Sequence, residues 1–383
     1  MSTSPPPYIL FRDDLARRET LFDQPEELLT ADTLDGLEAV FERTEAARVA
    51  GKWLAGYFSY EAGALFEPKL ASTLLSGRRI PLCCFGIFKA PKAGKPKPGA
   101  AAPGWILQEP AAAWTFQDYE KRFDRVHRHL REGGCYQANL TFPITAKWQG
   151  GPAAIFNALA LRQPVRHSAF VNLTETKILS RSPELFFKTD REGWIESLPM
   201  KGTARRGKTP ASDRAQKRFL QSDPKNRAEN RMIVDLLRND ISRISEVGTL
   251  SVPKLFKIET FETLHQMVSL VRAKLLPGLT IRDIFAALFP CGSITGAPKL
   301  SAMQILQTLE QKPRDIYCGA IGWIAPDGRM QFNVAIRTLT LYPGGEAVFN
   351  VGGGVVFDST AEEEYAECLL KARFALGDIK ISS

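Results

Sequence analysis

Hydrophobic residues recur along the chain with both helical and strand spacing. Tyr119, Phe123, Val126 and Leu130 are spaced four, three and four residues apart, which predicts an amphipathic helix over 115–131. Polar and apolar residues alternate from 136 to 148, as in a strand. The same criteria predict helices at 34–50 and 226–239 and strands near 82–88, 169–173, 178–188, 260–271, 318–323 and 331–341. No repeating βαβ unit is present, so the pattern predicts an α+β protein with largely antiparallel sheets.

Two stretches interrupt this pattern. Residues 90–104 are rich in Pro, Gly, Ala and Lys and contain too few apolar side chains to order themselves, which is typical of a linker. We therefore expect an N-terminal subdomain over 1–104 and a larger domain over 115–381. Residues 208–225 are polar, and we expect them to form a mobile connection.

The composition narrows the class of protein. With 383 residues and 44% hydrophobic side chains, the chain has ample material for a core. Neither an apolar run of about 18 residues nor a signal peptide is evident, so we expect a cytoplasmic protein. The six cysteines form no CxxC pair and only four histidines are present, which disfavours a zinc site or a disulfide framework.

The net charge of +8 indicates an anionic partner. The basic residues form no long tract and no basic motif interleaved with aromatic residues. An anionic small molecule is equally compatible with this charge, and we expect no nucleic-acid partner.

Candidate chemistry is densest between Gly352 and Lys371. Three consecutive glycines predict a turn whose N–H groups can face an anion, and Ser359 or Thr360 is a suitable N-cap for a following helix. On that helix Glu364, Glu367 and Lys371 share one face, which could hold a hard cation together with a carboxylate. On this stretch alone an ordinary surface helix is favoured, because exposed Glu/Lys pairs are common.

Three other side chains have two readings each. Glu184 follows a proline and precedes an apolar run, so it is either a partly desolvated general acid with a raised pKa or a strand-end glutamate in solvent. Lys201 is a nucleophile if it is buried beside Arg205 and Arg206, and otherwise an exposed lysine. Glu229 lies at the edge of an apolar helix face, where a carboxylate needs a partner or a cation.

Taken together and in order, the motifs resemble the chorismate-utilising enzymes, and among them those that form aminodeoxychorismate. The likeness covers about residues 115–380, with a weaker likeness over Trp53–Gly63. The motifs that carry it are Tyr136–Thr141, Ser182–Glu184, Pro199–Thr203, Arg227–Asp240, Glu262–Gln266, Gly292–Lys299 and Gly352–Lys371.

The resemblance implies a large two-layered antiparallel β architecture with flanking helices, and a site that holds chorismate and one Mg²⁺. Glu229 and Glu367 match the family's metal-binding carboxylates, with Glu364 behind them. This donor set suits Mg²⁺, which prefers carboxylates combined with water and a substrate oxygen. The positions that match carboxylate-binding groups of the substrate site are Arg337, Tyr317, Gly353, Gly354 and Lys371.

The resemblance also implies a reaction. Members that add water to chorismate carry a lysine where this chain has Gln137, and anthranilate-forming members usually carry a small residue where it has Lys201. By the mechanism so implied, Glu184 protonates the departing C4 hydroxyl while Lys201 attacks C2, and ammonia then attacks C4 and expels the lysine. The product is 4-amino-4-deoxychorismate, the precursor of para-aminobenzoate and folate. His265 and Thr295 are expected to position the C4 hydroxyl and the ring.

No glutaminase nucleophile elbow is evident, so ammonia is expected from a separate glutamine amidotransferase subunit or from solution. One alternative is anthranilate synthase component I, which Lys201 disfavours. Another is a non-catalytic chorismate sensor or scaffold, which the retained acid, lysine and metal carboxylates disfavour.

Overall fold

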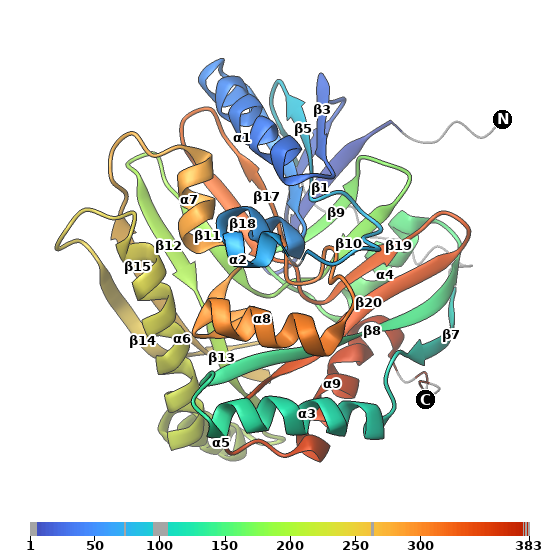
Figure 1. Cartoon of the computed structure of the whole chain (residues 1–383), viewed down its shortest axis with the longest axis vertical. Coiled ribbons are helices and arrows are strands. Elements are labelled where there is room, and N and C mark those ends of the chain that lie inside the picture. Colours follow the sequence, from blue (N-terminus) through green and yellow to red (C-terminus); the bar gives the residue numbers. More distant parts are fainter. Residues whose placement is uncertain are drawn as a thin grey trace.

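Two antiparallel sheets form the centre of the molecule. The structure is a computed structural model of the chain and describes residues 6–72, 74–94, 106–261, 264–377, 379 and 381. The sheets pack against each other, and helices cover their outer faces (Figure 1). The predicted α+β class, with a two-layered antiparallel core and flanking helices, is confirmed.

Within the described residues, each sheet has ten strands. The first runs in the order β16 (Gly296–Ala297), β8 (Gln137–Gln149), β20 (Glu346–Val355), β19 (Thr338–Leu341), β10 (Lys177–Ser180), β9 (Ser168–Asn172), β1 (Tyr8–Asp13), β2 (Arg18–Asp23) and β6 (Lys92–Gly94), and β7 (Ile106–Ala112) pairs with β8. The second runs in the order β13 (Met200–Arg205), β15 (Leu264–Lys274), β12 (Trp194–Leu198), β11 (Leu185–Thr189), β18 (Met330–Val334), β17 (Ala320–Ile324), β4 (Trp53–Phe58), β5 (Cys83–Phe88) and β3 (Glu27–Ala31), and β14 (Ser251–Thr260) pairs with β15.

The helices divide between the two outer faces. The first sheet packs against α3 (Phe116–Arg131), α4 (Pro152–Arg162), α8 (Lys299–Glu310) and α9 (Ala361–Leu376). The second packs against α1 (Leu34–Val49), α6 (Pro224–Ser242) and α7 (Ile281–Leu288). The remaining helical segments are α2 (Pro68–Ala71), α5 (Pro210–Ser222) and two 3₁₀ turns, η1 (Tyr60–Phe66) and η2 (Gly292–Ile294).

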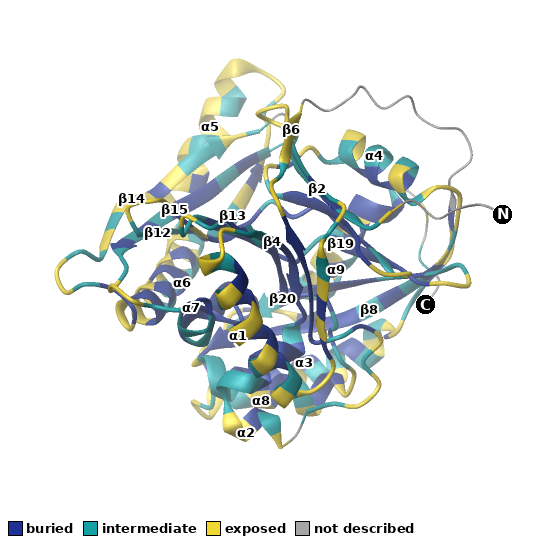
Figure 2. Cartoon of the chain, turned by 90° about the horizontal axis from the view of Figure 1, so that it is seen from above, coloured by how far each residue is buried: buried dark blue, intermediate teal, exposed yellow. Residues whose placement is uncertain are grey.

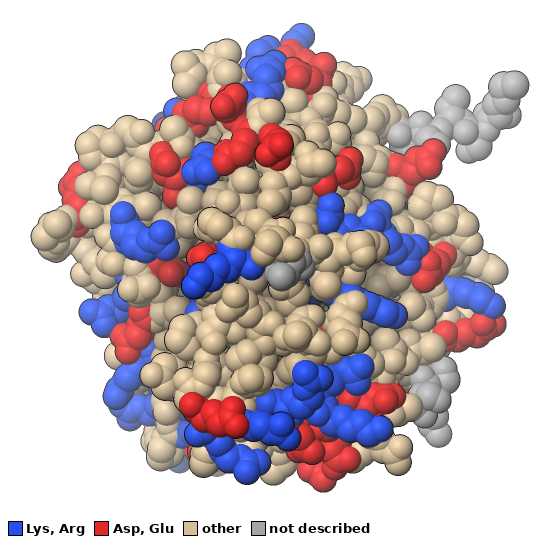
Figure 3. All heavy atoms as spheres, in the orientation of Figure 1, with Lys and Arg blue, Asp and Glu red and all other residues tan. Residues whose placement is uncertain are grey.

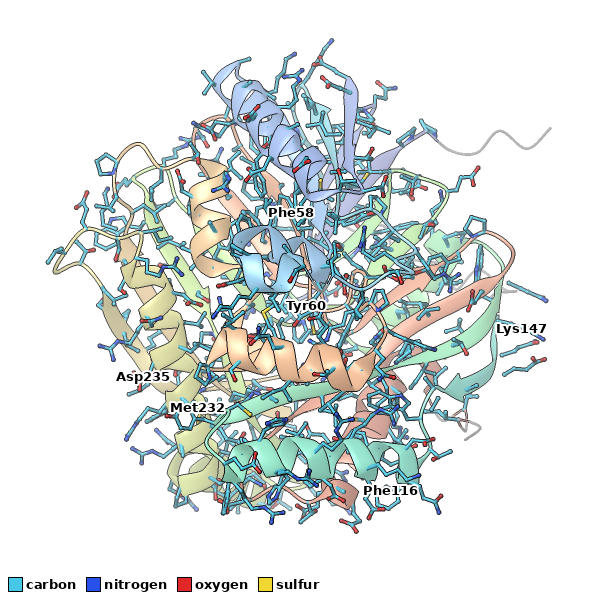
Figure 4. All side chains as sticks on the ribbon, viewed as in Figure 1. Phe58, Tyr60, Phe116, Lys147, Met232 and Asp235 are labelled. Carbon is cyan, nitrogen blue, oxygen red and sulfur yellow. The ribbon has the colours of Figure 1, made fainter. Side chains whose placement is uncertain are left out.

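Apolar side chains fill the layers on both sides of each sheet. Ile9 and Phe22 from the first sheet meet Tyr57 and Phe88 from the second in the layer between them. On the outer side of the second sheet, Phe58 packs among aromatic rings from α1 and α7 (Figure 4). The central strands are accordingly buried while the helix surfaces are exposed (Figure 2). Burial of this kind is the main favourable term in folding.

Helix α3 shows how the sequence sets an element. Its buried residues are Tyr119, Phe123, Val126 and Leu130, the set predicted from spacing. Thr115 and Asp118 form a capping box that satisfies N–H groups at its start. The prediction is confirmed.

Four local predictions are wrong. Residues 208–225 contain α5 rather than a mobile connection, with Thr209 as N-cap and Pro210 in the first turn. The predicted strand 331–341 is two strands, β18 and β19, in different sheets, because Arg337 between them has a φ of 51°. The predicted strand 178–188 is likewise two strands, β10 in the first sheet and β11 in the second, because Pro183 between them cannot donate to a ladder. The three glycines of 352–354 lie inside β20 rather than in a turn.

The linker predicted at 90–104 lies largely outside the described residues. Strands from both sides of it share both sheets: β1 pairs with β9, and β4 pairs with β17. Within the described residues, no helix combines the length and apolar character needed to cross a membrane.

Candidate active site

The glycine run of β20 is the centre of the candidate site. Gly352 and Gly354 pair with Thr141 and Asn139 of β8. The backbone of the glycine run is therefore hydrogen-bonded to β8 as part of the sheet. The missing side chains leave room for neighbours. A Cβ atom on Gly354 would lie 2.6 Å from Gln137 Nε2, and one on Gly353 would lie 2.5 Å from Glu364 Oε2. Glycine in a strand interior often marks such a close approach.

Glu184 is a buried carboxyl group on one side of this strand. It lies between β10 and β11, is 5% exposed, and its Oε1 accepts a hydrogen bond of 2.7 Å from Ser293 Oγ. Burial raises the pKa of Glu184 to about 7, although the Ser293 hydroxyl and the charge of Lys201 both act to lower it. The prediction of a desolvated carboxyl with a raised pKa is confirmed, and such a group can donate a proton near neutral pH.

Lys201 extends from β13 toward Gly354 in the glycine run. A Cβ atom on Gly354 would lie 3.4 Å from Lys201 Nζ, so the amine and the Gln137 amide converge there. Lys201 is half-buried, but Arg205 and Arg206 are exposed and do not surround it as predicted. The next residue, Gly202, has a φ of 86° and a Cβ there would meet Asn226 of α6, so only glycine allows α6 to pack this close.

Of the three polar side chains on this face of β8, two are hydrogen-bonded to neighbouring segments, and the third has a donor without an acceptor within the described residues. Asn139 Nδ2 donates to the Ile294 carbonyl at 3.0 Å, and Thr141 Oγ1 donates to Glu310 at 3.0 Å. Gln137 is 1% exposed, and its Nε2 has no acceptor in the part of the chain that the structure describes. A buried donor without an acceptor is costly, which indicates that a ligand oxygen completes the site. We refer to Glu184, Ser293, Lys201 and Gln137 as the acid end.

Carboxylates gather around α9 on the other side of the glycine run. Glu364 Oε1 accepts a hydrogen bond of 2.7 Å from Ser359, and burial, Glu367 and Glu229 together raise its pKa. Glu367 forms an ion pair of 2.7 Å with Lys371. Partial loss of hydration opposes its ionisation, but Lys371, Lys201 and Lys225 lower the pKa of Glu367 overall.

Lys371 also donates to the Gly352 carbonyl at 2.8 Å, which fixes α9 to the glycine strand. Thr360 is the N-cap of α9, as one of the two predicted alternatives. We refer to Glu229, Glu364, Glu367 and Lys371 as the carboxylate end.

The carboxylate end fits Mg²⁺ but does not form a closed cage. Glu364 is influenced by the charges of both Glu229 and Glu367. Nevertheless, in the described ranges no three His, Cys, Asp or Glu side chains are grouped closely enough to hold a metal ion by themselves. Mg²⁺ commonly takes one or two carboxylates and completes its octahedron with water and substrate oxygens.

Arg337 and Tyr317 lie where the two sheets meet. Burial lowers the pKa of Arg337, and the charges of Tyr317 and Glu367 act in the opposite direction. Tyr317 is 6% exposed and lines a cavity of about 400 Å³ together with Thr338 and Asn350. A buried guanidinium is well suited to hold a carboxylate through two hydrogen bonds.

Two predicted residues make other contacts. His265 is fully buried, and its ring nitrogens contact Asp213 Oδ1 at 2.9 Å and Thr260 Oγ1 at 3.1 Å rather than the acid end. Among the described residues, Thr295 Oγ1 donates to the carbonyls of Cys291 and Gly292, both at 3.3 Å. The hydroxyl that reaches Glu184 belongs to Ser293, two residues earlier in the same loop.

Ser293 was missed from the sequence, although it lies within the Gly292–Lys299 motif. Its orientation depends on the 3₁₀ turn η2 and on a contact between residues 109 positions apart. The loop sequence alone does not distinguish its hydroxyl from that of Thr295.

Known proteins are similar to this chain in sequence and in fold. A family model described as chorismate binding enzyme matches residues 7–377. Aminodeoxychorismate synthase component 1 of Klebsiella aerogenes is 41% identical over 264 residues, which are 69% of this chain and 58% of that protein's length. Anthranilate synthase component 1 of Aquifex aeolicus is 34% identical over 269 residues, 70% of this chain and 54% of that protein.

A solved structure is similar over almost the whole chain. The crystal structure of anthranilate synthase component I from Streptococcus pneumoniae superposes with a TM-score of 0.79, covering 97% of this chain and 93% of that one, at 24% identity. At this identity the likeness supports the fold.

Proposed function

Because the chain belongs to the chorismate-binding enzyme family, we propose that it transfers an amino group from ammonia to chorismate and forms 4-amino-4-deoxychorismate. The observation that carries this proposal is the convergence of Lys201 and Gln137 on Gly354, with the buried acid Glu184 within electrostatic reach of the lysine. A lysine amine, a protonated carboxyl and an amide donor at one place suit nucleophilic substitution of a hydroxyl group. Relatives named aminodeoxychorismate synthase support the same reaction.

In the proposed reaction, Glu184 gives its proton to the C4 hydroxyl of chorismate as Lys201 Nζ bonds to C2. The C4–O bond breaks, the ring double bond shifts by one position, water leaves, and the lysine nitrogen gives a proton to the Glu184 carboxylate. Ammonia then bonds to C4 and the bond between C2 and the lysine breaks. The double bond shifts back, and the lysine leaves as an amine that takes up the proton lost by the added nitrogen. A lysine nucleophile and a carboxylic acid poised near pH 7 are the two groups that these steps require.

The remaining side chains hold the dianionic substrate. Arg337 and Tyr317 bind the enolpyruvyl carboxylate, supported by the Gly353 and Gly354 backbone, and Lys371 lies near the ring carboxylate. Gln137 Nε2 supplies a donor that lacks an acceptor within the described residues. Oriented charged donors of this kind hold a carboxylate in a fixed position.

Glu229 and Glu367 would hold Mg²⁺, with Glu364 behind them. When bound, the ion would neutralise and orient the ring carboxylate. The pKa of Glu367 is lowered by three lysines, so this carboxylate is ionised and available as a ligand at neutral pH.

The ammonia is proposed to come from a separate glutamine amidotransferase subunit, and the product to enter para-aminobenzoate and folate synthesis in the cytoplasm. The relatives named component 1 support a partner component.

The test is to incubate the purified chain with chorismate, Mg²⁺ and ammonium and to separate the products. The proposal expects 4-amino-4-deoxychorismate from the wild type and none from Lys201→Ala. Anthranilate and pyruvate would instead identify an anthranilate synthase, and tight chorismate binding without turnover would identify a sensor. Either result would overturn the proposal.

A further inference from the structure

The net charge of the chain is concentrated in one segment. Residues 201–257 contain fourteen Lys and Arg against six Asp and Glu, a surplus of eight that equals the formal net charge of the whole chain. The other 326 residues are therefore balanced. A concentration of one sign of charge creates a local field that attracts the opposite sign.

Most of this charge faces solvent. The structure describes the segment throughout, and twelve of its fourteen basic residues are exposed, whereas Asp235 is its one exposed acidic residue. Asp235 projects outward from α6 (Figure 4). Basic side chains accordingly follow the lower-left edge of the molecule in Figure 3, where α5 and α6 lie in Figure 1.

Some of these residues have a structural explanation. Lys254 and Lys257 lie on the outermost strand β14, where lysine discourages pairing with another chain. Arg227 and Arg231 lie over the ring of Phe256 at 4.9 and 5.9 Å. These contacts do not account for the basic residues of α5.

Helix α5 is unusual because it buries so little. Leu220 is its only fully buried residue, and Phe219 beside it is 57% exposed. Arg214 and Arg218, one turn apart, are exposed on the same helix. An outward aromatic side chain accompanied by arginines is the composition that protein–protein interfaces favour.

The same helix is connected to the candidate active site. Asp213, in its first turn, accepts hydrogen bonds from Arg206 Nε at 2.7 Å and from the Gly207 N–H at 2.9 Å, and contacts His265 Nε2 at 2.9 Å. Arg206 directly follows β13, the strand that carries Lys201. A protein bound to α5 would therefore lie beside the strand that supplies the nucleophile.

We infer that Arg214, Arg218 and Phe219 of α5 form the docking surface for an acidic face of the amidotransferase subunit that releases ammonia from glutamine. This inference rests on the proposed function. Docking here places the source of ammonia next to the reaction site, which limits its loss to solvent and its protonation before it reaches C4. Complementary charge across the interface speeds association and selects the partner.

The experiment compares two ammonia sources for each variant. The double variant Arg214→Glu/Arg218→Glu and the single variant Phe219→Ala are assayed with ammonium alone, and then with glutamine and the separately purified amidotransferase subunit of the same organism. The control is Arg125→Glu/Arg128→Glu, which reverses two exposed arginines of α3. Affinity for the subunit is measured for all variants by sedimentation.

We expect the α5 double variant to lose about tenfold or more in affinity and in glutamine-dependent rate, since interface hot spots typically exceed the tenfold equivalent of 1.4 kcal/mol. The Phe219 variant should lose less, and the α3 control should behave as wild type. The ammonium-dependent rate should stay unchanged in all of them, which shows that the variants fold.

Three results would overturn the inference. The first is glutamine-dependent activity that the α5 changes leave intact, or an amidotransferase subunit that does not bind the wild type. The second is an equal fall of ammonium-dependent kcat/KM for chorismate, which would assign the surface to steering of the substrate. The third is binding of a labelled DNA duplex, instead of the subunit, that the α5 changes abolish. If the wild type forms no aminodeoxychorismate from ammonium, the proposed function itself fails, which is a separate result.

Discussion

The acid end and the carboxylate end of the site place the same functional group in opposite environments. Glu184 is 5% exposed, and burial raises its pKa to about 7. The Glu367 side chain is 54% exposed, and three lysines lower its pKa. At neutral pH one glutamate retains much of its proton while the other is ionised. Two carboxyl groups whose pKa values diverge in this way suit the separate roles that we propose for them, proton donor and cation ligand.

The glycine run allows the two ends to lie this close together. Gly353 faces Glu364 and Lys371, and Gly354 faces Gln137 and Lys201, so successive residues of one strand serve opposite sides. Lys201 lowers the pKa of both Glu184 and Glu367, so its charge acts on both ends.

The largest effect is expected from removing the acid. Glu184→Gln retains the shape of the side chain but cannot donate the proton to the leaving hydroxyl, so kcat should fall by about 10²–10⁴. Steady-state rates with ammonium measure this, and Glu192→Gln, on the surface, is the control. A variant that keeps more than half of the wild-type rate would show that Glu184 is not the proton donor.

The same variant should be stabilised at high pH. Between pH 4.5 and 7 folded Glu184 retains a proton that the unfolded chain loses, so the free energy of unfolding falls as pH rises through this window. Above pH 7, ionisation of buried Glu184 lowers the free energy of unfolding by about 3 kcal/mol in full. Glu184→Gln removes this loss. Denaturant unfolding measures the free energy of unfolding of both proteins at pH 4.5 and 8. The difference, variant minus wild type, should be larger at pH 8 by about this amount. Glu367→Gln should show no gain, because the pKa of Glu367 is lowered. An equal gain in both variants would contradict the difference between the two ends.

At the carboxylate end, Glu367→Gln should weaken Mg²⁺ binding by about tenfold or more, because an ionised ligand is replaced by a neutral one. Calorimetric titration of Mg²⁺ in the presence of chorismate measures this, with the exposed Glu363→Gln as the control. Unchanged Mg²⁺ affinity would remove Glu367 from the metal site.

The smallest effect is a shift of the pH–rate profile. Ser293 donates to Glu184 and acts to lower its pKa. Ser293→Ala should therefore raise the pKa of Glu184. The alkaline limb of the pH–rate profile, in which activity falls as pH rises, should then move to higher pH by about one unit or less. Thr295→Val should leave the limb in place, since that hydroxyl donates to backbone carbonyls. A downward shift for Ser293→Ala would contradict the assignment.

The spacing of residues along the chain was enough to predict some helices and strands, but not how these elements pair and pack. The apolar spacing of α3 was a local signal, and that prediction was confirmed. The proline before Glu184 left two interpretations open, and the burial and raised pKa of Glu184 agree with the desolvated carboxyl. The glycine run was taken for a turn because glycine disfavours strands, but pairing along β8 overrides that preference. Helix α5 was missed because its only large apolar residues are the adjacent Phe219 and Leu220, which are too few to stand out in a polar stretch.

The site itself depends on contacts between distant residues. The hydrogen bond from Ser293 to Glu184 and the approach of Gln137 to Gly354 join parts of the chain more than 100 residues apart. The left-handed φ of Arg337, which separates two strands into different sheets, occurs at a residue type that rarely adopts it. The grouping of Glu229 with α9 followed from the family resemblance rather than from any local pattern.

Formation of the proposed covalent bond to Lys201 is the most direct test of the amino-transfer mechanism. The chain is mixed with chorismate and Mg²⁺ in the absence of ammonia, quenched in acid, digested and analysed by mass spectrometry. We expect the peptide that contains Lys201 to gain the mass of chorismate less one water, and Glu184→Gln to slow this gain greatly. Formation of 4-amino-4-deoxychorismate by Lys201→Ala, or an adduct on a different residue, would contradict it.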